Sequence, residues 1–183
     1  RLPIKTLQFS RKEQHRAYAI LKEELKYNRQ GYIIYPVIEE SYALDLSGAK
    51  KMFTELKNGA FKEFRLGLLH GKLNPREQHE VISQFKNKQL DLLVATTILE
   101  VGIDIPNATC MIIESAQRFG LSQLHQLRGR IGRGGLQSSC ILISDSQTQD
   151  SVARLAAMVS SKDGFHIAEE DLKIRGPGEF FGN

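Results

Sequence analysis

The sequence predicts an α/β fold, in which a parallel β-sheet carries helices on both faces and a helical appendage follows at the C-terminal end. Short continuous apolar runs, typical of strands that are buried on both sides, alternate along the chain with segments of helical periodicity. The 183 residues are 41% hydrophobic and 25% charged, which is the composition of a globular domain. No apolar run approaches the roughly 18 residues of a membrane span, so no membrane partner is expected.

The first half of the chain alternates predicted helices with predicted strands. Ser10 and Glu13 have the spacing of a capping box and open a helix through about Asn28, with Gly31 ending it. The run YIIYPV at residues 32–37 predicts a buried strand. The elements expected next are a helix over residues 46–57, a strand over residues 65–69, and a helix that starts at Asn74 and Pro75 and places Gln78, Val81, Ile82 and Phe85 on one face.

The second half predicts three more strands and ends in helices. The strands are DLLVA at 91–95, CMII at 110–113 and CILI at 140–143, with a helix over 123–131 between the last two. After Ser144 the sequence becomes polar. A helix follows in which Val152, Leu155, Ala156 and Val159 have core spacing. We therefore expect one domain over residues 1–144 and a helical hairpin over residues 145–183, or one more helix layer of the same domain.

The two cysteines, Cys110 and Cys140, each lie in an apolar strand-like run. We expect two buried thiols rather than a disulfide, because no apolar leader sequence opens the chain and a reducing compartment follows from that. No CxxC and no histidine pair at ligand spacing occurs, so no metal site is predicted.

Positive charge is concentrated in one window of the sequence. The formal net charge is +4, and no acidic residue occurs between Glu114 and Asp145. The basic residues of that window are Arg118, Arg128, Arg130 and Arg133. Such a cluster indicates either contact with phosphate groups or a solvated basic face.

Within this window, QLHQLRGRIGRGG at residues 123–135 is the first candidate site. If the segment is helical, Gln126, Gly129, Arg130 and Arg133 lie on one face, while Leu124, Leu127 and Ile131 are buried on the other. Two guanidinium groups around a glycine suit a terminal phosphate. The alternative is a surface helix with ordinary arginines.

Two further candidate segments follow predicted strands. Thr96 and Thr97 come directly after one strand and offer hydroxyls and backbone amides for a nucleic-acid phosphate, while Asp104 could accept from a ribose hydroxyl. His70 ends another strand. An ordinary strand-to-helix loop is the alternative. GLLHGKL at 67–73 lacks the spacing and the hydroxyl residue of a phosphate-binding loop, so this chain is not expected to hydrolyse a nucleotide by itself.

Together these segments resemble the second motor domain of superfamily 2 helicases. ATTILEVGIDIP resembles motif V, QLRGRIGRG resembles motif VI, and HGKLNPREQHEVISQF resembles the block between motifs IV and V. YPVIEES, SAQRFGLSQLHQLRGRIGRG and DGFHIAEEDLKIRGPGEFFG are similar to a bacterial family of fork-remodelling DNA helicases. The last stretch also resembles a translocation motif that this family shares with transcription-repair coupling factor.

The resemblance implies roles for individual residues on a RecA-like fold. Arg130 and Arg133 would be catalytic and would reach the phosphates of ATP across a domain cleft. The other implied roles are ATP binding by Gln126, Gly129 and Asp104, DNA binding by Thr96, Thr97 and His70, and coupling of hydrolysis to movement by Arg154 and Arg175.

The resemblance also implies partners. The function would be that of an ATP-dependent helicase that remodels forks and Holliday junctions in repair and recombination, in the bacterial cytoplasm. ATP and Mg²⁺ would bind mainly to a first motor domain that this chain lacks, as it lacks a wedge domain. We therefore expect an excised fragment or a short paralogue, inactive in isolation. The alternatives are the equivalent piece of transcription-repair coupling factor and a non-catalytic nucleic-acid-binding module.

Overall fold

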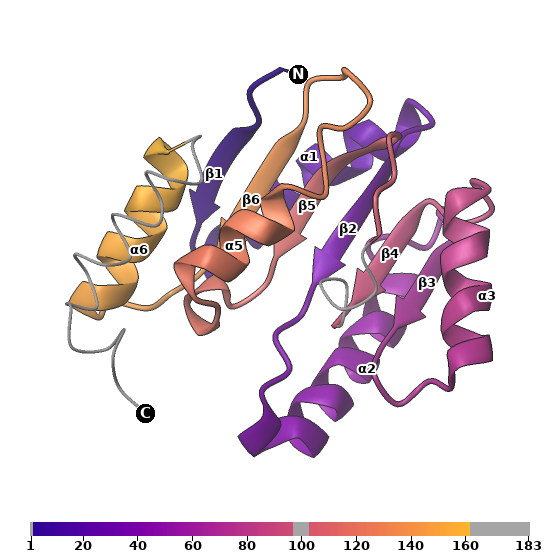
Figure 1. Ribbon diagram of the computed structural model, residues 1–183, viewed down its shortest axis with the longest axis horizontal. Coiled ribbons are helices and arrows are strands. Elements are labelled where there is room, and N and C mark those ends of the chain that lie inside the picture. The colour runs from indigo at the N-terminus through magenta and orange to yellow at the C-terminus, as the bar shows by residue number, and fades with distance from the viewer. Residues whose placement is uncertain (1, 97–102, 162–183) are drawn as a thin grey trace.

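The computed structural model describes residues 2–96 and 103–161, and within them one parallel sheet forms the centre of the molecule (Figure 1). Its six strands lie in the order β1-β6-β5-β2-β4-β3, and every neighbouring pair is parallel. The strands are β1 (Lys5–Phe9), β2 (Gln30–Ile34), β3 (Leu66–Leu69), β4 (Leu92–Ala95), β5 (Ala108–Ile113) and β6 (Ser139–Ile143). The predicted parallel sheet is confirmed.

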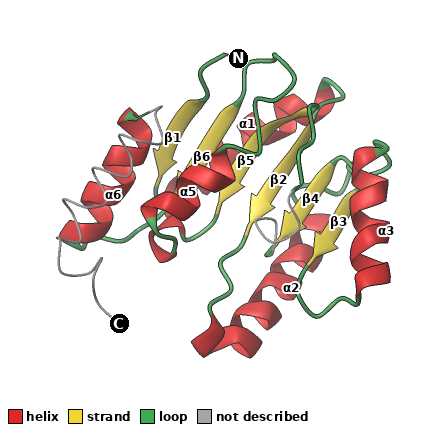
Figure 2. Ribbon diagram, in the orientation of Figure 1, coloured by secondary structure: helices red, strands yellow, loops and turns green. Residues whose placement is uncertain are grey.

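Helices cover both faces of this sheet (Figure 2). The helices α1 (Gln14–Lys26) and α2 (Tyr42–Asn58) pack on one face, where Leu21, Leu25 and Leu56 are buried. The helices on the other face are α3 (Pro75–Lys86), α5 (Leu121–Arg128) and α6 (Gln149–Ser160). Strands β2, β4 and β5 are buried along their whole length, as expected for the centre of a two-sided parallel sheet.

The two thiols lie on opposite faces of the sheet. Cys110 of β5 belongs to the core under α1, whereas Cys140 of β6 belongs to the core under α5 and α6. Both are fully buried and free, and burial raises the pKa of each thiol. The prediction of two buried thiols is confirmed, and burial disfavours the thiolate, which is the reactive form of cysteine.

Strand β1 was not predicted from the sequence. In KTLQF, Lys5 and Gln8 are exposed and Thr6 and Phe9 are buried, and among the described strands β1 pairs with β6, in a register that places Lys5 beside Ser139. An edge strand in which Lys5, Thr6 and Gln8 are polar lacks the continuous apolar run that marked the other strands.

The end of the first helix also differs from the prediction. A 3₁₀ turn (Arg11–Glu13) precedes α1, and the predicted capping box at Ser10 is present. The chain leaves α1 through Asn28, whose φ of 62° is left-handed. Gly31 lies inside β2, where an added Cβ would be 2.4 Å from Leu21 Cδ1, so this glycine permits close packing rather than ending the helix.

Helix α6 turns a different face inward from the predicted one. Leu155 and Met158 are fully buried, whereas Val152 and Val159 are 46% and 40% exposed, and Ala156 is exposed as well. The predicted inward set was therefore wrong except for Leu155. Because Leu155 and Met158 join the core beneath α5, this helix forms another layer of the same core. The division at residue 144 stays a prediction.

Candidate functional site

The first candidate segment is helical only up to Arg128. Gly129 caps α5, and Gly132 and Gly135, with φ of 74° and 76°, turn the chain back toward β6. The predicted helix to residue 131, with Arg130 and Arg133 on a continuous helical face, is therefore wrong. Leu124, Leu127 and Ile131 are nevertheless buried, as the pattern predicted.

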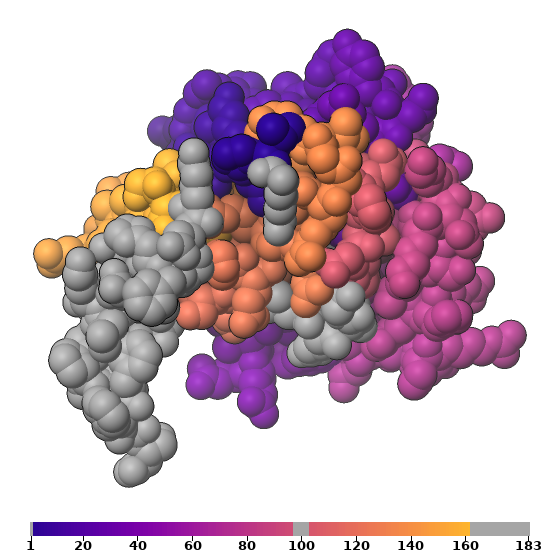
Figure 3. All heavy atoms as spheres, turned by 45° about the horizontal axis from the view of Figure 1, so that its top comes forward, coloured from indigo at the N-terminus to yellow at the C-terminus, as the bar shows by residue number. Residues whose placement is uncertain are grey.

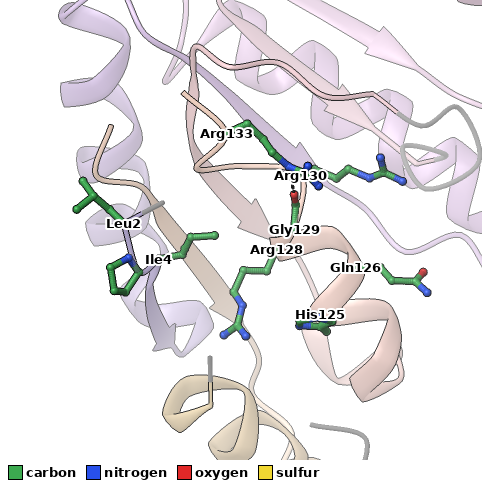
Figure 4. A pocket seen from close by; sticks show the side chains of 9 residues that line it. Leu2, Ile4, His125, Gln126, Arg128, Gly129, Arg130 and Arg133 are labelled. Atoms are coloured by element: carbon green, nitrogen blue, oxygen red, sulfur yellow. Dashed lines mark hydrogen bonds between the residues drawn. The ribbon is translucent and has the colours of Figure 1, made fainter. Parts of the chain in front are cut away.

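The turn still brings the two arginines together. Arg133 Nε donates to the Gly129 carbonyl oxygen at 2.8 Å, which folds the Arg133 side chain back over the end of α5 (Figure 4). Asp104 Oδ1 lies 3.5 Å from Arg130 Nη1 and 3.7 Å from Arg133 Nε. Three residues predicted to contact one nucleotide thus meet around one carboxylate oxygen.

Backbone contact holds the two segments of this site in register. An added Cβ on Gly134 would lie 2.4 Å from the Pro106 carbonyl oxygen, so the turn after Arg133 packs directly on the segment after Asp104. Asp104 itself stands between Ile103 and Ile105, which are 1% and 3% exposed. The carboxylate is therefore presented by a segment anchored on both sides.

Gln126 and Gly129 belong to the same end of α5. Gln126 is exposed, and its side chain points in the same direction as Arg130, away from Leu2 and Ile4 (Figure 4). Gly129 lines a cavity of about 570 Å³ that opens between the end of α5 and residues 2–4. Figure 3 shows the N-terminal residues lying against the segment that precedes β6, where Gln137 Nε2 donates to the Pro3 carbonyl oxygen.

Arg128 has a structural position rather than a surface one. It is 4% exposed, and its Nη1 lies 3.1 Å from Thr6 Oγ1 and 2.9 and 2.7 Å from the carbonyl oxygens of Met158 and Ser161. This side chain connects α5 to β1 and to the end of α6. The sequence window gave no sign that one of its arginines is buried.

Arg118 is the fourth arginine of that window, and sequence reasoning missed its partner. It lies in a 3₁₀ turn (Ala116–Arg118) and donates through Nη1 and Nη2 to Asp45 of α2 at 3.0 and 2.8 Å. These bonds from Arg118 hold the pKa of Asp45 well below its usual range. Because Asp45 is distant in sequence, no local pattern could reveal this pair.

His70 and Thr96 lie together at the carboxyl edge of the sheet, directly after the paired residues Leu69 of β3 and Ala95 of β4. The backbone N–H of Thr96 donates to the Leu69 carbonyl oxygen at 3.0 Å, so this amide is not available to a ligand. The Thr96 hydroxyl lies 3.5 Å from the same oxygen, to which it donates a long hydrogen bond. Thr97 lies outside the described residues.

The His70 ring is largely buried, which lowers the pKa of its imidazole, and nearby Lys50 lowers that pKa further. The Lys72 backbone N–H donates to His70 Nδ1 at 3.1 Å, and Nδ1 can accept this bond only in the neutral ring. The Lys72 ammonium group lies 5.4 Å from the centre of the Tyr42 ring. The backbone of Lys72 therefore contacts His70, and its side chain adds a basic group to this region. The sequence HGK could have suggested this residue.

Arg154 is the coupling candidate that the structure describes. Its Nη1 donates to the carbonyl oxygens of Gln117 and Phe119 at 2.9 and 2.7 Å, and Nη2 pairs with Asp150. Its side chain is 13% exposed. Arg154 therefore ties α6 to the turn that leads into α5. Arg175 lies outside the described residues.

The described residues form neither a metal-ligand cluster nor a membrane-spanning helix. Between residues 2 and 96 and between 103 and 161, no group of three His, Cys, Asp or Glu side chains could hold a metal ion. None of the helices in those ranges has the length and apolar character needed to cross a membrane.

Comparison with known families gives a match over most of the chain. The family described as "Helicase conserved C-terminal domain" matches residues 16–135. The resemblance of the sequence motifs to helicases is confirmed.

Individual relatives are more specific. The chain is 50% identical to the ATP-dependent DNA helicase RecG of Synechocystis sp., over 100% of the chain and 22% of that protein. RecG proteins of Thermotoga maritima and Bacillus subtilis are both 47% identical, over 90% and 91% of the chain and 21% and 24% of their own lengths. The chain therefore spans less than a quarter of these relatives. They bear the name of the bacterial DNA helicase family that the motifs resemble.

Solved structures agree with this. A RecG structure bound to a three-way DNA junction has a TM-score of 0.82 and 39% identity, over 98% of this chain and 23% of that one. The Hef helicase domain of Pyrococcus furiosus has a TM-score of 0.53 at 22% identity, over 79% and 28%, and shows likeness of fold alone. The predicted RecA-like fold is confirmed.

Proposed function

The chain belongs to the helicase conserved C-terminal domain family, and from this premise we propose that it is the second motor domain of an ATP-dependent DNA helicase that remodels forks and Holliday junctions. Its similarity along the whole length to RecG proteins supports this choice over transcription-repair coupling factor. The observation that carries the proposal is the convergence of Arg130 and Arg133 at the end of α5. Such an enzyme acts in DNA repair and recombination.

In this function, Arg130 and Arg133 act on a nucleotide that another domain binds. ATP and Mg²⁺ sit mainly on a first motor domain, and closure of the cleft brings both guanidinium groups to the terminal phosphate. There they stabilise the charge that develops on the transferring phosphoryl group, which is worth about 10³- to 10⁵-fold in rate for such arginines. Gln126 points the same way as Arg130 and supports the contact, and Gly129 adds no side chain to obstruct it.

The carboxyl edge of the sheet is the proposed DNA contact. His70, Thr96 and Thr97 contact the backbone of one strand, and the exposed Lys72 ammonium group adds a positive charge beside them. Because this edge and the arginine site belong to the same domain, cleft closure on ATP moves the contact along the DNA.

Coupling to the remainder of the enzyme passes through Arg154 and Arg175. The bonds of Arg154 to the carbonyl oxygens of Gln117 and Phe119 support this role, because that turn continues into α5. The wedge domain and first motor domain of the same polypeptide are the proposed protein partners. Two buried thiols and a DNA substrate fit the bacterial cytoplasm as the compartment.

The test of this function is Arg130→Ala and Arg133→Ala in the full-length enzyme. We expect each to lower DNA-stimulated ATPase turnover by about two to three orders of magnitude, the scale of a lost transition-state contact, with DNA affinity almost unchanged. Arg16→Ala, which removes an exposed arginine of α1, serves as the matched control and should leave turnover intact. Normal turnover in both site variants would refute the proposed role.

A further inference from the structure

Asp104 occupies an unexpected place in the arginine site. The resemblance to helicases places this residue at the ribose, yet its Oδ1 lies within 3.5 Å of Arg130 Nη1 and 3.7 Å of Arg133 Nε. A single carboxylate oxygen thus faces both positive charges that the proposed function assigns to the terminal phosphate.

The position of this carboxylate is fixed by its neighbours. Ile103 and Ile105 are buried in the core on either side of it, and Gly134 packs on the Pro106 backbone so closely that no side chain would fit. Arg133 is also held through Nε by the Gly129 carbonyl oxygen. Contacts within the chain therefore hold the segments that carry Asp104 and Arg133.

The contact itself is long compared with the other ion pairs that the described residues form. The distances of 3.5 and 3.7 Å exceed the 2.8 Å between Arg118 Nη2 and Asp45 Oδ2. Asp104 is also 46% exposed. A carboxylate at this distance orients the guanidinium groups by charge, while a phosphate that makes short bidentate bonds could replace it.

We propose that Asp104 is a positioning residue, which holds Arg130 and Arg133 in place when no nucleotide is bound and yields them to the phosphates of ATP. This inference rests on the proposed function of the two arginines. Asp104 and the incoming phosphate are both negatively charged, so one anion replaces another. The positive charges of the two guanidinium groups are therefore neutralised in both states.

The consequence is a competition that a kinetic experiment can detect. In the full-length enzyme, Asp104→Asn keeps the shape of the side chain and removes its charge. Phosphates then meet no competing carboxylate, and we expect KM for ATP to fall about two- to fivefold, the range of one exposed ion pair. We expect kcat to fall as well, because the arginines are no longer oriented before binding.

A nucleotide without ribose hydroxyls separates this role from a ribose contact. With 2′,3′-dideoxy-ATP, Asp104→Asn should lower KM by the same factor as with ATP, and Asp104→Glu, which keeps the carboxylate, should restore values near those of the wild type. Glu24→Gln, which breaks the remote pair of Glu24 with Arg29, is the control and should change neither constant.

Two results would overturn the proposal. One is a rise in KM for ATP that disappears with dideoxy-ATP, which would place Asp104 at the ribose. The other is an unchanged KM with both nucleotides. Either result, together with strong loss of turnover in Arg133→Ala, would reject the role of Asp104 and leave the proposed function standing.

Discussion

The arginines between Glu114 and Asp145 show how differently one residue type is used within a short segment. Arg128 is buried and bonded to backbone carbonyl groups, Arg118 forms a close pair with Asp45, and Arg130 and Arg133 share the loose contact with Asp104. The window therefore forms neither a single phosphate-binding cluster nor a uniform solvated face. Side-chain partners, rather than charge in sequence, decide which arginine is available to a ligand.

The pair between Arg118 and Asp45 yields a prediction at the residue scale. A carboxyl whose pKa is depressed by folding contributes stability above its unfolded pKa, near 4, and that contribution is lost as pH falls further. We expect Asp45→Asn to lower the free energy of unfolding by about 1–3 kcal/mol at pH 7. Urea unfolding across a pH series should show this difference shrinking below about pH 4.

Glu23→Gln is the control for that series, because Glu23 is exposed on α1. It should produce a difference of less than about 0.5 kcal/mol at each pH. If the effect of Asp45→Asn had the same size at acidic and neutral pH, the pair with Arg118 would not be its source.

Among the elements, α6 offers a matched pair of aliphatic positions. Leu155 is fully buried in the core beneath α5, whereas Val152 is 46% exposed on the outer side. We expect Leu155→Ala to lower the free energy of unfolding by about 2–5 kcal/mol. Val152→Ala should change it by less than about 0.5 kcal/mol.

Chemical unfolding of the two variants checks this assignment. The original sequence pattern treated both positions as inward-facing. Similar losses in the two variants would therefore favour that pattern over the observed orientation of α6.

The elements also show what the sequence could and could not predict. The continuous apolar runs identified β2 to β6 with small errors at their ends, and the cap at Asn74 located the start of α3 at Pro75. Strand β1 was not predicted because the polar residues Lys5, Thr6 and Gln8 interrupt any apolar run at this edge of the sheet. The helix predicted over residues 123–131 runs past the observed end of α5 at Arg128. The apolar periodicity continues into the following turn, in which Gly132 adopts a positive φ.

For the candidate site, the sequence proposed residues but did not indicate their arrangement. Motif resemblance identified Asp104, Arg130 and Arg133, yet no local pattern indicated that they contact one another. That contact depends on the close approach of Gly134 to Pro106, which is a tertiary feature. The hydrogen bond from the Thr96 amide to the Leu69 carbonyl oxygen is also a tertiary contact, and for the same reason the sequence did not predict it.

For the whole molecule, we expect no ATP hydrolysis by this chain alone. Its sequence contains neither a phosphate-binding loop nor the acidic pair that would hold Mg²⁺ after a strand. A turnover assay of the purified chain, with and without branched DNA, should give background rates. Clear DNA-stimulated hydrolysis that survives further purification would contradict the division of the motor into two domains.

DNA binding by this chain is expected to be weak and strongly dependent on salt. The net charge is +4, and contacts to phosphates release counterions, so affinity should fall steeply as salt increases. In a fluorescence titration, Lys72→Ala should reduce the slope of log affinity against log salt by about one unit. Lys26→Ala, at the other end of the sheet, should leave that slope unchanged, and tight binding that ignores salt would contradict the expectation.

The sheet order also determines when the domain can be completed. Strand β1 is the first strand in the chain, yet its partner is β6, so Lys5 must find Ser139 after nearly all of the domain has been made. Until β6 is synthesised, β1 has no neighbour and one edge of β5 is open. Contacts this distant in sequence make folding slow and expose strand edges to other chains meanwhile. A ribosome-bound chain that ends before residue 139 should therefore remain sensitive to proteases, and protection should appear only once β6 has left the exit tunnel.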